Sequence, residues 1–212
     1  MDQKERMKKG QLYWPNDPQI MKEQNATRDL LYQFNHTKPH EDQKRQELMK
    51  LMFGDVGPDC YLEIPVRANW GCRHVHLGRG VYINFNVTFV DDSDIYIGDH
   101  TMCGPNVTFV TAAHPVWPSL RLREYQYNLP VFIGKNCWLG AGVNIMPGVH
   151  IGDNSVIGAG SLVTHDIPAN VVAYGSPAQV QRQIGQHDRE YYHKQLKIDW
   201  DNLPPEDPED QQ

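Results

Sequence analysis

Aliphatic side chains return at every sixth position between residues 131 and 166. The residues that carry this period are Ile133, Leu139, Ile145, Ile151, Ile157 and Val163. Two positions before each stands a small or branched residue, namely Val131, Cys137, Val143, Val149, Ser155 and Ser161. Residues two apart in a strand point to the same face. The pattern therefore predicts a short strand and a corner repeated six times, because stacked units bury a core that no single unit can bury. This is the pattern of a parallel β-helix.

The same period extends upstream, with one slip and one interruption. Aliphatic or aromatic residues six apart, each with a valine two before, stand at Leu77, Ile83 and Phe89. Two extra residues at Asp91–Asp94 shift the phase, and Ile97, Cys103 and Phe109 resume it. Phe109 and Ile133 are twenty-four positions apart, a multiple of six, so residues 111–130 are predicted to leave the β-helix as a loop and rejoin it in register. Long loops on a rigid scaffold usually carry function. We assign residues 56–185 to the β-helix.

Glycine follows the periodic aliphatic residue at Gly134, Gly140, Gly152 and Gly158. A corner of this kind needs either positive φ or close backbone approach, and glycine supplies both without steric cost. Asn84 holds the same position after Ile83. Because asparagine tolerates the left-handed region, a structural role at that corner is one interpretation of Asn84.

The two ends of the chain lack the period. Residues 1–55 are predicted to form a small helical unit, in which Asp17 and Pro18 are a good N-cap and first helical residue. Residues 186–200 are predicted to form a short C-terminal helix. Residues 201–212 form an acidic, proline-rich tail that is expected to be disordered.

Composition narrows the function classes. The net charge of −6 argues against nucleic acid as a main partner. No stretch has the length of a membrane span and the N-terminus is not a signal peptide, so no membrane association is expected. The four cysteines form no CxxC pair and two of them fall on apolar repeat positions, which favours a cytoplasmic protein without structural zinc.

Several motifs together resemble the maltose/galactoside O-acetyltransferase branch of the hexapeptide-repeat acyltransferases. They are ERMKKGQLYWPNDP, LLYQFN, the NFN and VDD pair, AAHPV, NCWLGAGVNIMPGV and NVVAYGSPA. The resemblance covers the chain to about residue 185. It implies a left-handed β-helix, acetyl-CoA as donor, a sugar or glycoside acceptor, and a homotrimer with active sites between subunits. No metal is expected.

The resemblance also implies roles for individual residues. His114, in the long loop, is the expected general base, and an imidazole with a pKa near ~6.5 suits the removal of a hydroxyl proton. Substrate contacts are implied for Asp17, Asn69, Tyr82, Asn84, Asp92 and Gln126. Contacts with the cofactor are implied for Asn84, Trp138, Ala141, Ala159, Thr164, His165, Gln179 and Arg182.

Some positions depart from the family pattern. Asn69 stands where relatives carry Ser or Asp, and Gln24 where Arg is frequent. His165 replaces a common lysine and Gln179 a common arginine, so fewer fixed charges are expected to face the phosphates of CoA.

Each assignment has a simpler structural alternative. Asp17 can be an N-cap, and Asp91 and Asp94 are expected to be a solvated acidic turn. Trp138 is expected to point outward because it precedes a core residue, so trimer packing also explains it. Alternative functions are an antibiotic-modifying acetyltransferase of the same fold and, further away, a non-catalytic trimeric scaffold. A zinc carbonic anhydrase is disfavoured because its histidine spacing is missing.

Overall fold

The computed structural model describes residues 2–204. The chain begins with three helices: α1 (Gln3–Lys8), α2 (Pro18–Asn35) and α3 (Asp42–Met52). The side chain of Asp17 caps α2 by accepting hydrogen bonds from the N–H groups of Gln19 and Ile20, at 2.9 and 3.4 Å. Residues 3–52 are thus helical where the sequence predicts helices, and α2 starts at the predicted Asp17–Pro18 pair.

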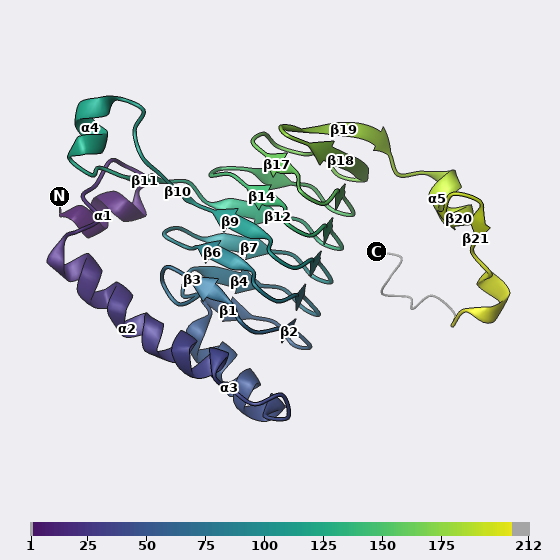
Figure 1. Ribbon diagram of the computed structural model, residues 1–212, viewed down its shortest axis with the longest axis horizontal. Helices are drawn as coiled ribbons and strands as arrows, with labels where there is room; N and C mark the ends of the chain where they lie inside the picture. The colour runs from purple at the N-terminus through teal and green to yellow at the C-terminus, as the bar shows by residue number, and fades with distance from the viewer. Residues whose placement is uncertain (1, 205–212) are drawn as a thin grey trace. The chain divides into compact units, whose positions relative to one another are not determined.

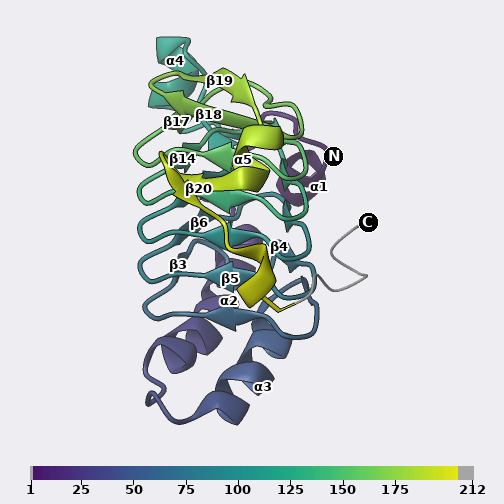
Figure 2. The same cartoon turned by 90° about the vertical axis from the view of Figure 1, so that its right-hand side faces the viewer.

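A parallel β-helix follows, and its coils stack along one axis (Figures 1 and 2). The first sheet contains β1 (Asp55–Val56), β4 (Val75–Leu77), β7 (Ile95–Ile97), β12 (Val131–Ile133) and β15 (His150–Ile151). The second contains β2 (Tyr61–Leu62), β5 (Tyr82–Ile83), β8 (Met102–Cys103), β13 (Trp138–Leu139), β16 (Val156–Ile157), β18 (Val171–Gly175) and β19 (Ala178–Gln183). The third contains β3 (Arg67–Ala68), β6 (Thr88–Val90), β9 (Thr108–Val110), β14 (Asn144–Ile145) and β17 (Leu162–Val163).

The periodic residues form the core inside these three sheets, as predicted. Asn144 pairs with Leu162, and Phe132 pairs with His150. Because the residues of each pair are three hexapeptides apart in the sequence, one coil contains three hexapeptides. The six residues of the 131–166 period are buried. Side chains from α2 and α3, including Phe34 and Met49, join the same apolar cluster and close one end of the core.

The corner glycines serve close approach rather than positive φ. A Cβ at Gly152 would lie 2.4 Å from the backbone nitrogen of Ala169 on the next coil. Positive φ occurs three residues after the aliphatic position instead, at Gly80, Asn86, His100, Asn106, Asn136, Gly142, Gly148, Asn154, Gly160 and Asn170. A left-handed role for Asn84 is therefore wrong, since Asn86 takes that conformation in its coil.

The 111–130 segment leaves the β-helix between the third and the first sheet, as predicted. It contains β10 (Ala112–Ala113), α4 (Pro118–Leu122) and β11 (Tyr127–Asn128), and β10 pairs with β11 in antiparallel register. An antiparallel bridge joins Gln126 to Tyr13, so this loop is held against the N-terminal segment beside α1 (Figure 1).

From Gln183 the chain forms a second compact unit. Its helix α5 covers Gln186–Glu190, and a hairpin of β20 (Tyr191–His193) and β21 (Leu196–Lys197) and a short 3₁₀ helix at Trp200–Asn202 follow. The prediction of one helix over 186–200 is wrong in extent: a bulged β-ladder begins at Tyr191. Residues 205–212 of the predicted tail lie outside the described part. Within residues 2–204, no helix is both long and apolar enough to span a membrane.

Candidate active site

A cavity of about 490 Å³ lies where the long loop, the N-terminal segment and the phase slip meet. Four predicted site residues line it together: Asn69, Asp92, His114 and Gln126. Gln24, noted as a departure from the family pattern, lines it as well. Asn69 follows β3, Asp92 follows β6, and His114 follows β10, so the cavity lies on the edge between the third and the first sheet.

Asp92 is fixed by amide donors on both carboxylate oxygens. Asn69 Nδ2 donates to Oδ2 at 2.8 Å, and Gln126 Nε2 donates to Oδ1 at 3.2 Å. The residue is buried except for the part that faces the cavity. A carboxylate offers about four acceptor sites, so two hydrogen bonds leave capacity for hydroxyl groups of a ligand.

The imidazole of His114 is exposed and is oriented by one backbone contact. Its Nδ1 lies 2.8 Å from the carbonyl oxygen of Tyr125. Because a carbonyl oxygen can only accept, Nδ1 carries the proton in this contact and Nε2 of the neutral ring is left with its lone pair. This tautomer is the one that a general base at Nε2 requires.

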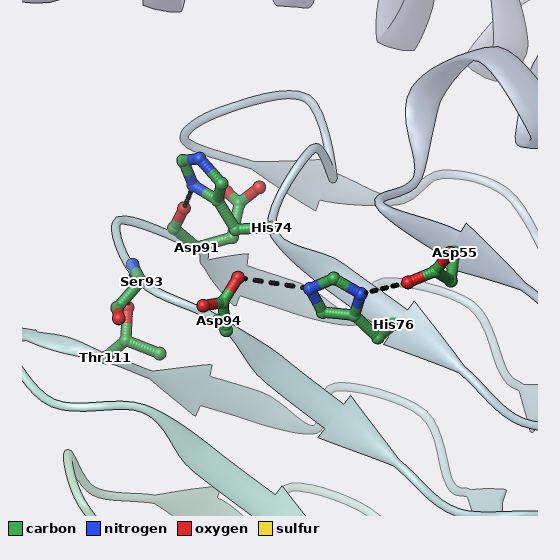
Figure 3. Close-up of polar contacts among 7 residues, drawn as sticks. All are labelled: Asp55, His74, His76, Asp91, Ser93, Asp94 and Thr111. Carbon is green, nitrogen blue, oxygen red and sulfur yellow. Dashed lines mark hydrogen bonds and ion pairs between the residues drawn. The ribbon is translucent and has the colours of Figure 1, made fainter. Parts of the chain in front are cut away.

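The phase slip is a buried polar corner rather than a solvated turn. Asp91 is 0% exposed, which corrects the expectation for this residue. Its Oδ1 accepts from the N–H of Trp70 at 2.7 Å, and its carbonyl oxygen accepts from His74 Nδ1 (Figure 3). Burial raises the pKa of Asp91 to about 6.

Asp94 remains partly exposed and belongs to a chain of polar contacts with His76 and Asp55. His76 lies between Asp94 and Asp55, with Nε2 3.1 Å from Asp94 Oδ1 and Nδ1 2.8 Å from Asp55 Oδ2 (Figure 3). The N–H of Ser93 donates to Thr111 Oγ1 at 2.9 Å, which ties the slip to the start of the long loop. The slip is thus held on both sides, and this fixes the backbone that carries Asp92.

A different edge carries three of the residues predicted to contact the cofactor. Asn84, Ala141 and Ala159 lie at corners between the second and the third sheet. Trp138, on β13, projects outward from the second sheet and is 55% exposed, as predicted. Tyr82 lies half-buried on the same sheet. In one chain, the third sheet therefore separates these residues from the cavity that contains His114.

This second edge fits an extended thioester. Ala141 and Ala159 are exposed and small, and a Cβ at the neighbouring Gly142 and Gly160 would meet nothing within 4 Å. Among the described residues, the N–H of Ala141 has no hydrogen-bond acceptor, so it is available to an oxygen of a ligand.

The remaining predicted cofactor residues are exposed near the end of the β-helix. Thr164 and His165 follow β17 and contact each other at 2.9 Å. Gln179 and Arg182 lie three apart on β19, so their side chains leave opposite faces of that strand. The structure does not bring these two into one cluster.

Two buried residues of the site, Tyr13 and Asn128, were missed in the sequence analysis. Both side chains lie behind Asp92 and hydrogen-bond with Gln126. The alternation of Gln126 and Asn128 within YQYN is typical of a strand and could have identified Asn128. Tyr13 is brought there by its bridge to Gln126, which no local pattern predicts.

All four cysteines are buried and reduced. Within residues 2–204, no three His, Cys, Asp or Glu side chains converge in a way that could hold a metal ion.

Comparison with known proteins gives matches to the helical N-terminus, to the repeats and to the whole fold. Residues 6–57 match the maltose acetyltransferase hexapeptide capping motif, and residues 130–165 match the bacterial transferase hexapeptide with six repeats. A galactoside O-acetyltransferase from Lactococcus lactis is 52% identical over 91% of this chain and 93% of its own length. A solved galactoside acetyltransferase in complex with coenzyme A superposes with a TM-score of 0.90 at 45% identity, covering 94% of this chain and 99% of that one. A maltose O-acetyltransferase from Clostridium difficile gives 0.85 at 42% identity, covering 88% and 99%.

The fold is the left-handed β-helix of hexapeptide-repeat enzymes, as predicted. The chain belongs to the galactoside and maltose O-acetyltransferase family.

Proposed function

We propose that this protein transfers the acetyl group of acetyl-CoA directly to a hydroxyl group of a sugar or glycoside, with His114 as general base. The observation that carries the proposal is the hydrogen bond from His114 Nδ1 to the Tyr125 carbonyl, which leaves Nε2 available as a base in a residue that lines the cavity with Asp92. Asp92, Asn69 and Gln126 offer the acceptors and donors that sugar hydroxyls require. We propose that Asp17 contributes as a substrate contact in addition to capping α2.

The reaction needs no covalent enzyme intermediate. Nε2 of His114 takes the proton of the acceptor hydroxyl while the oxygen of that hydroxyl attacks the thioester carbon. The N–H of Ala141 supports the negative charge on the carbonyl oxygen, and donors of this kind contribute about 10²–10³-fold in kcat. The C–S bond then breaks, and the imidazolium returns its proton to the sulfur of CoA.

The separation of the two edges supports a shared site. His114 and Asp92 lie on one edge of the prism, whereas Asn84, Ala141 and Ala159 lie on another, next to the second sheet that carries Trp138. A direct transfer needs both sets around one ligand pair, so we propose a homotrimer in which His114 of one subunit faces the cofactor edge of its neighbour. Cyclic symmetry closes such a head-to-tail contact into a ring. Four reduced, buried cysteines favour a cytoplasmic enzyme.

The test is turnover of acetyl-CoA with a panel of mono- and disaccharides and, as the rival acceptors, acetylatable antibiotics. We expect transfer to a sugar, and His114→Ala should lower kcat at least ~100-fold. His40→Ala, at an exposed histidine between α2 and α3, should leave kcat unchanged. A His114→Ala enzyme with near-normal turnover contradicts the general-base role. A preference for antibiotics over sugars contradicts the proposed sugar acceptor. If no acceptor leads to consumption of the acetyl-CoA thioester, the result favours the non-catalytic trimeric scaffold.

A further inference from the structure

Behind Asp92 lies a closed set of hydrogen bonds centred on the hydroxyl group of Tyr13. Gln126 Nε2 donates to this oxygen at 2.6 Å and Asn128 Nδ2 donates to it at 3.1 Å. The hydroxyl donates in turn to Asn128 Oδ1 at 3.3 Å. Tyr13 is 1% and Asn128 2% exposed, so water cannot replace these partners easily.

The bonds of this set end on Asp92. The second Nδ2 hydrogen of Asn128 reaches the Asp92 backbone oxygen at 2.9 Å, and the second Nε2 hydrogen of Gln126 reaches Asp92 Oδ1. Each amide group has two hydrogens, and Tyr13 accepts one from each. Without the Tyr13 oxygen, Asn128 Nδ2 loses one of its two acceptors, and Gln126 Nε2 keeps Asn128 Oδ1, at 3.1 Å, as its alternative to Asp92 Oδ1. Both amides can then reorient away from Asp92.

The same tyrosine fixes the segment that orients His114. The backbone of Tyr13 exchanges two hydrogen bonds with the backbone of Gln126, at 2.9 and 3.0 Å. Tyr125, whose carbonyl oxygen accepts from His114 Nδ1, is the residue just before Gln126. One residue of the N-terminal segment is therefore connected to both the base and the acceptor-binding carboxylate.

We propose that Tyr13 and Asn128 are positioning residues that hold Asp92 in the geometry required to bind the acceptor. The inference rests on the proposed function. Burial and the neighbouring Asp92 raise the pKa of Tyr13, so its hydroxyl stays protonated and acts as a hydrogen-bond partner rather than as an acid or a base. Its ring packs with Met7, Ile20 and Trp70, and these contacts remain in a phenylalanine variant.

The test is Tyr13→Phe, measured as separate KM values for sugar and acetyl-CoA. We expect the KM for the sugar to rise about fivefold to tenfold, the size of one net hydrogen bond, with the KM for acetyl-CoA unchanged. Asn128→Ala should act in the same direction and keeps the test decisive if Tyr13→Phe folds poorly. Tyr127→Phe, which removes a hydroxyl from the opposite face of β11, is the matched control and should leave both KM values unchanged.

A double-mutant cycle separates positioning from general destabilisation. If Tyr13 acts through Asp92, adding Tyr13→Phe to Asp92→Asn should raise the acceptor KM less than twofold further, because contacting residues in one network are not additive. The positioning role is overturned if Tyr13→Phe raises the acceptor KM equally in the wild-type and Asp92→Asn backgrounds, or if an active Tyr13→Phe enzyme has an unchanged acceptor KM. Neither result affects the proposed function. A wild-type protein that acetylates no sugar overturns the proposed function and the inference with it.

Discussion

The carboxyl group of Asp91 has one satisfied and one unsatisfied oxygen. Oδ1 accepts from the Trp70 backbone, whereas Oδ2 is buried without a hydrogen-bond partner among the described residues. Burial therefore favours the neutral acid, and its pKa rises from 3.8 to about 6. The folded-state pKa is the higher one, so the stabilising effect of the protonated acid is full below about pH 4 and is lost as pH rises through about 6.

We predict that Asp91→Asn changes the pH dependence of stability. Asparagine keeps an oxygen for the Trp70 N–H and cannot ionise. The free energy of unfolding of the variant relative to wild type should thus rise between pH 4 and pH 7.5, by on the order of 2–3 kcal/mol. Denaturant titrations of both proteins at the two pH values measure this, and a constant difference between them contradicts it.

A second prediction for a single residue concerns Gln179 and the affinity for CoA. It stands exposed on β19 where an arginine is expected to face the CoA phosphates. Gln179→Arg should lower the dissociation constant of CoA about threefold to tenfold, as a charge-assisted contact at an exposed site does. Calorimetric titration of CoA measures it. Gln43→Arg on α3 controls for net charge, and no gain from Gln179→Arg removes this residue from the cofactor site.

Among the elements, the coils were the most predictable part of the chain. Their inward residues follow one rule, so Ile133 to Val163 could be placed from the period alone. The glycines that follow the periodic aliphatic residues could be predicted from the sequence. The reason for glycine there could not, because the period does not tell which corner residue has positive φ. The hairpin at Tyr191 could not be predicted, since β20 and β21 pair locally through a bulge without a marked alternation.

Variants of two glycines distinguish the two reasons for glycine at a corner, namely close backbone approach and positive φ. Gly152→Ala places a Cβ 2.4 Å from the Ala169 nitrogen, and that atom belongs to the backbone of a stacked coil and cannot move away. Gly160→Ala meets nothing within 4 Å but has φ +71°. We expect a loss of unfolding free energy above ~3 kcal/mol for the first, as in severe overpacking, and of about 1 kcal/mol for the second. Thermal unfolding ranks them, and equal losses contradict the distinction.

In the whole molecule, the residues of the candidate site divide between two edges of one prism. The sequence allowed His114, Asp92 and Gln126 to be named, and the cavity brings them together. It did not predict their separation from Asn84 and Ala141, because edge assignment depends on which sheet each hexapeptide joins. Tyr13 was missed for a related reason: its partner Gln126 is distant in sequence and reached through an irregular loop.

This separation leads to a complementation test. His114→Ala and Asn84→Ala should each be inactive as homotrimers, because each lacks one half of every site. In mixed trimers, a site is complete when an intact His114 of one subunit faces an intact Asn84 of the next. Random assembly of equal amounts makes this combination at about a quarter of the interfaces of a closed ring.

Coexpression of the two variants should therefore restore about a quarter of wild-type activity, whereas mixing the separately assembled trimers should restore little. Sedimentation should give three copies of the 24.4 kDa chain for every variant. A pair of two variants at the same edge, His114→Ala with Asp92→Ala, is the matched control. Every mixed interface in that pair draws its base and its carboxylate from one subunit, so no site regains both. Activity from this control would mean that the base and the carboxylate of one site come from different subunits. No activity from the first pair in confirmed mixed trimers would place the whole site within a single subunit. Either result contradicts the proposed division between the two edges.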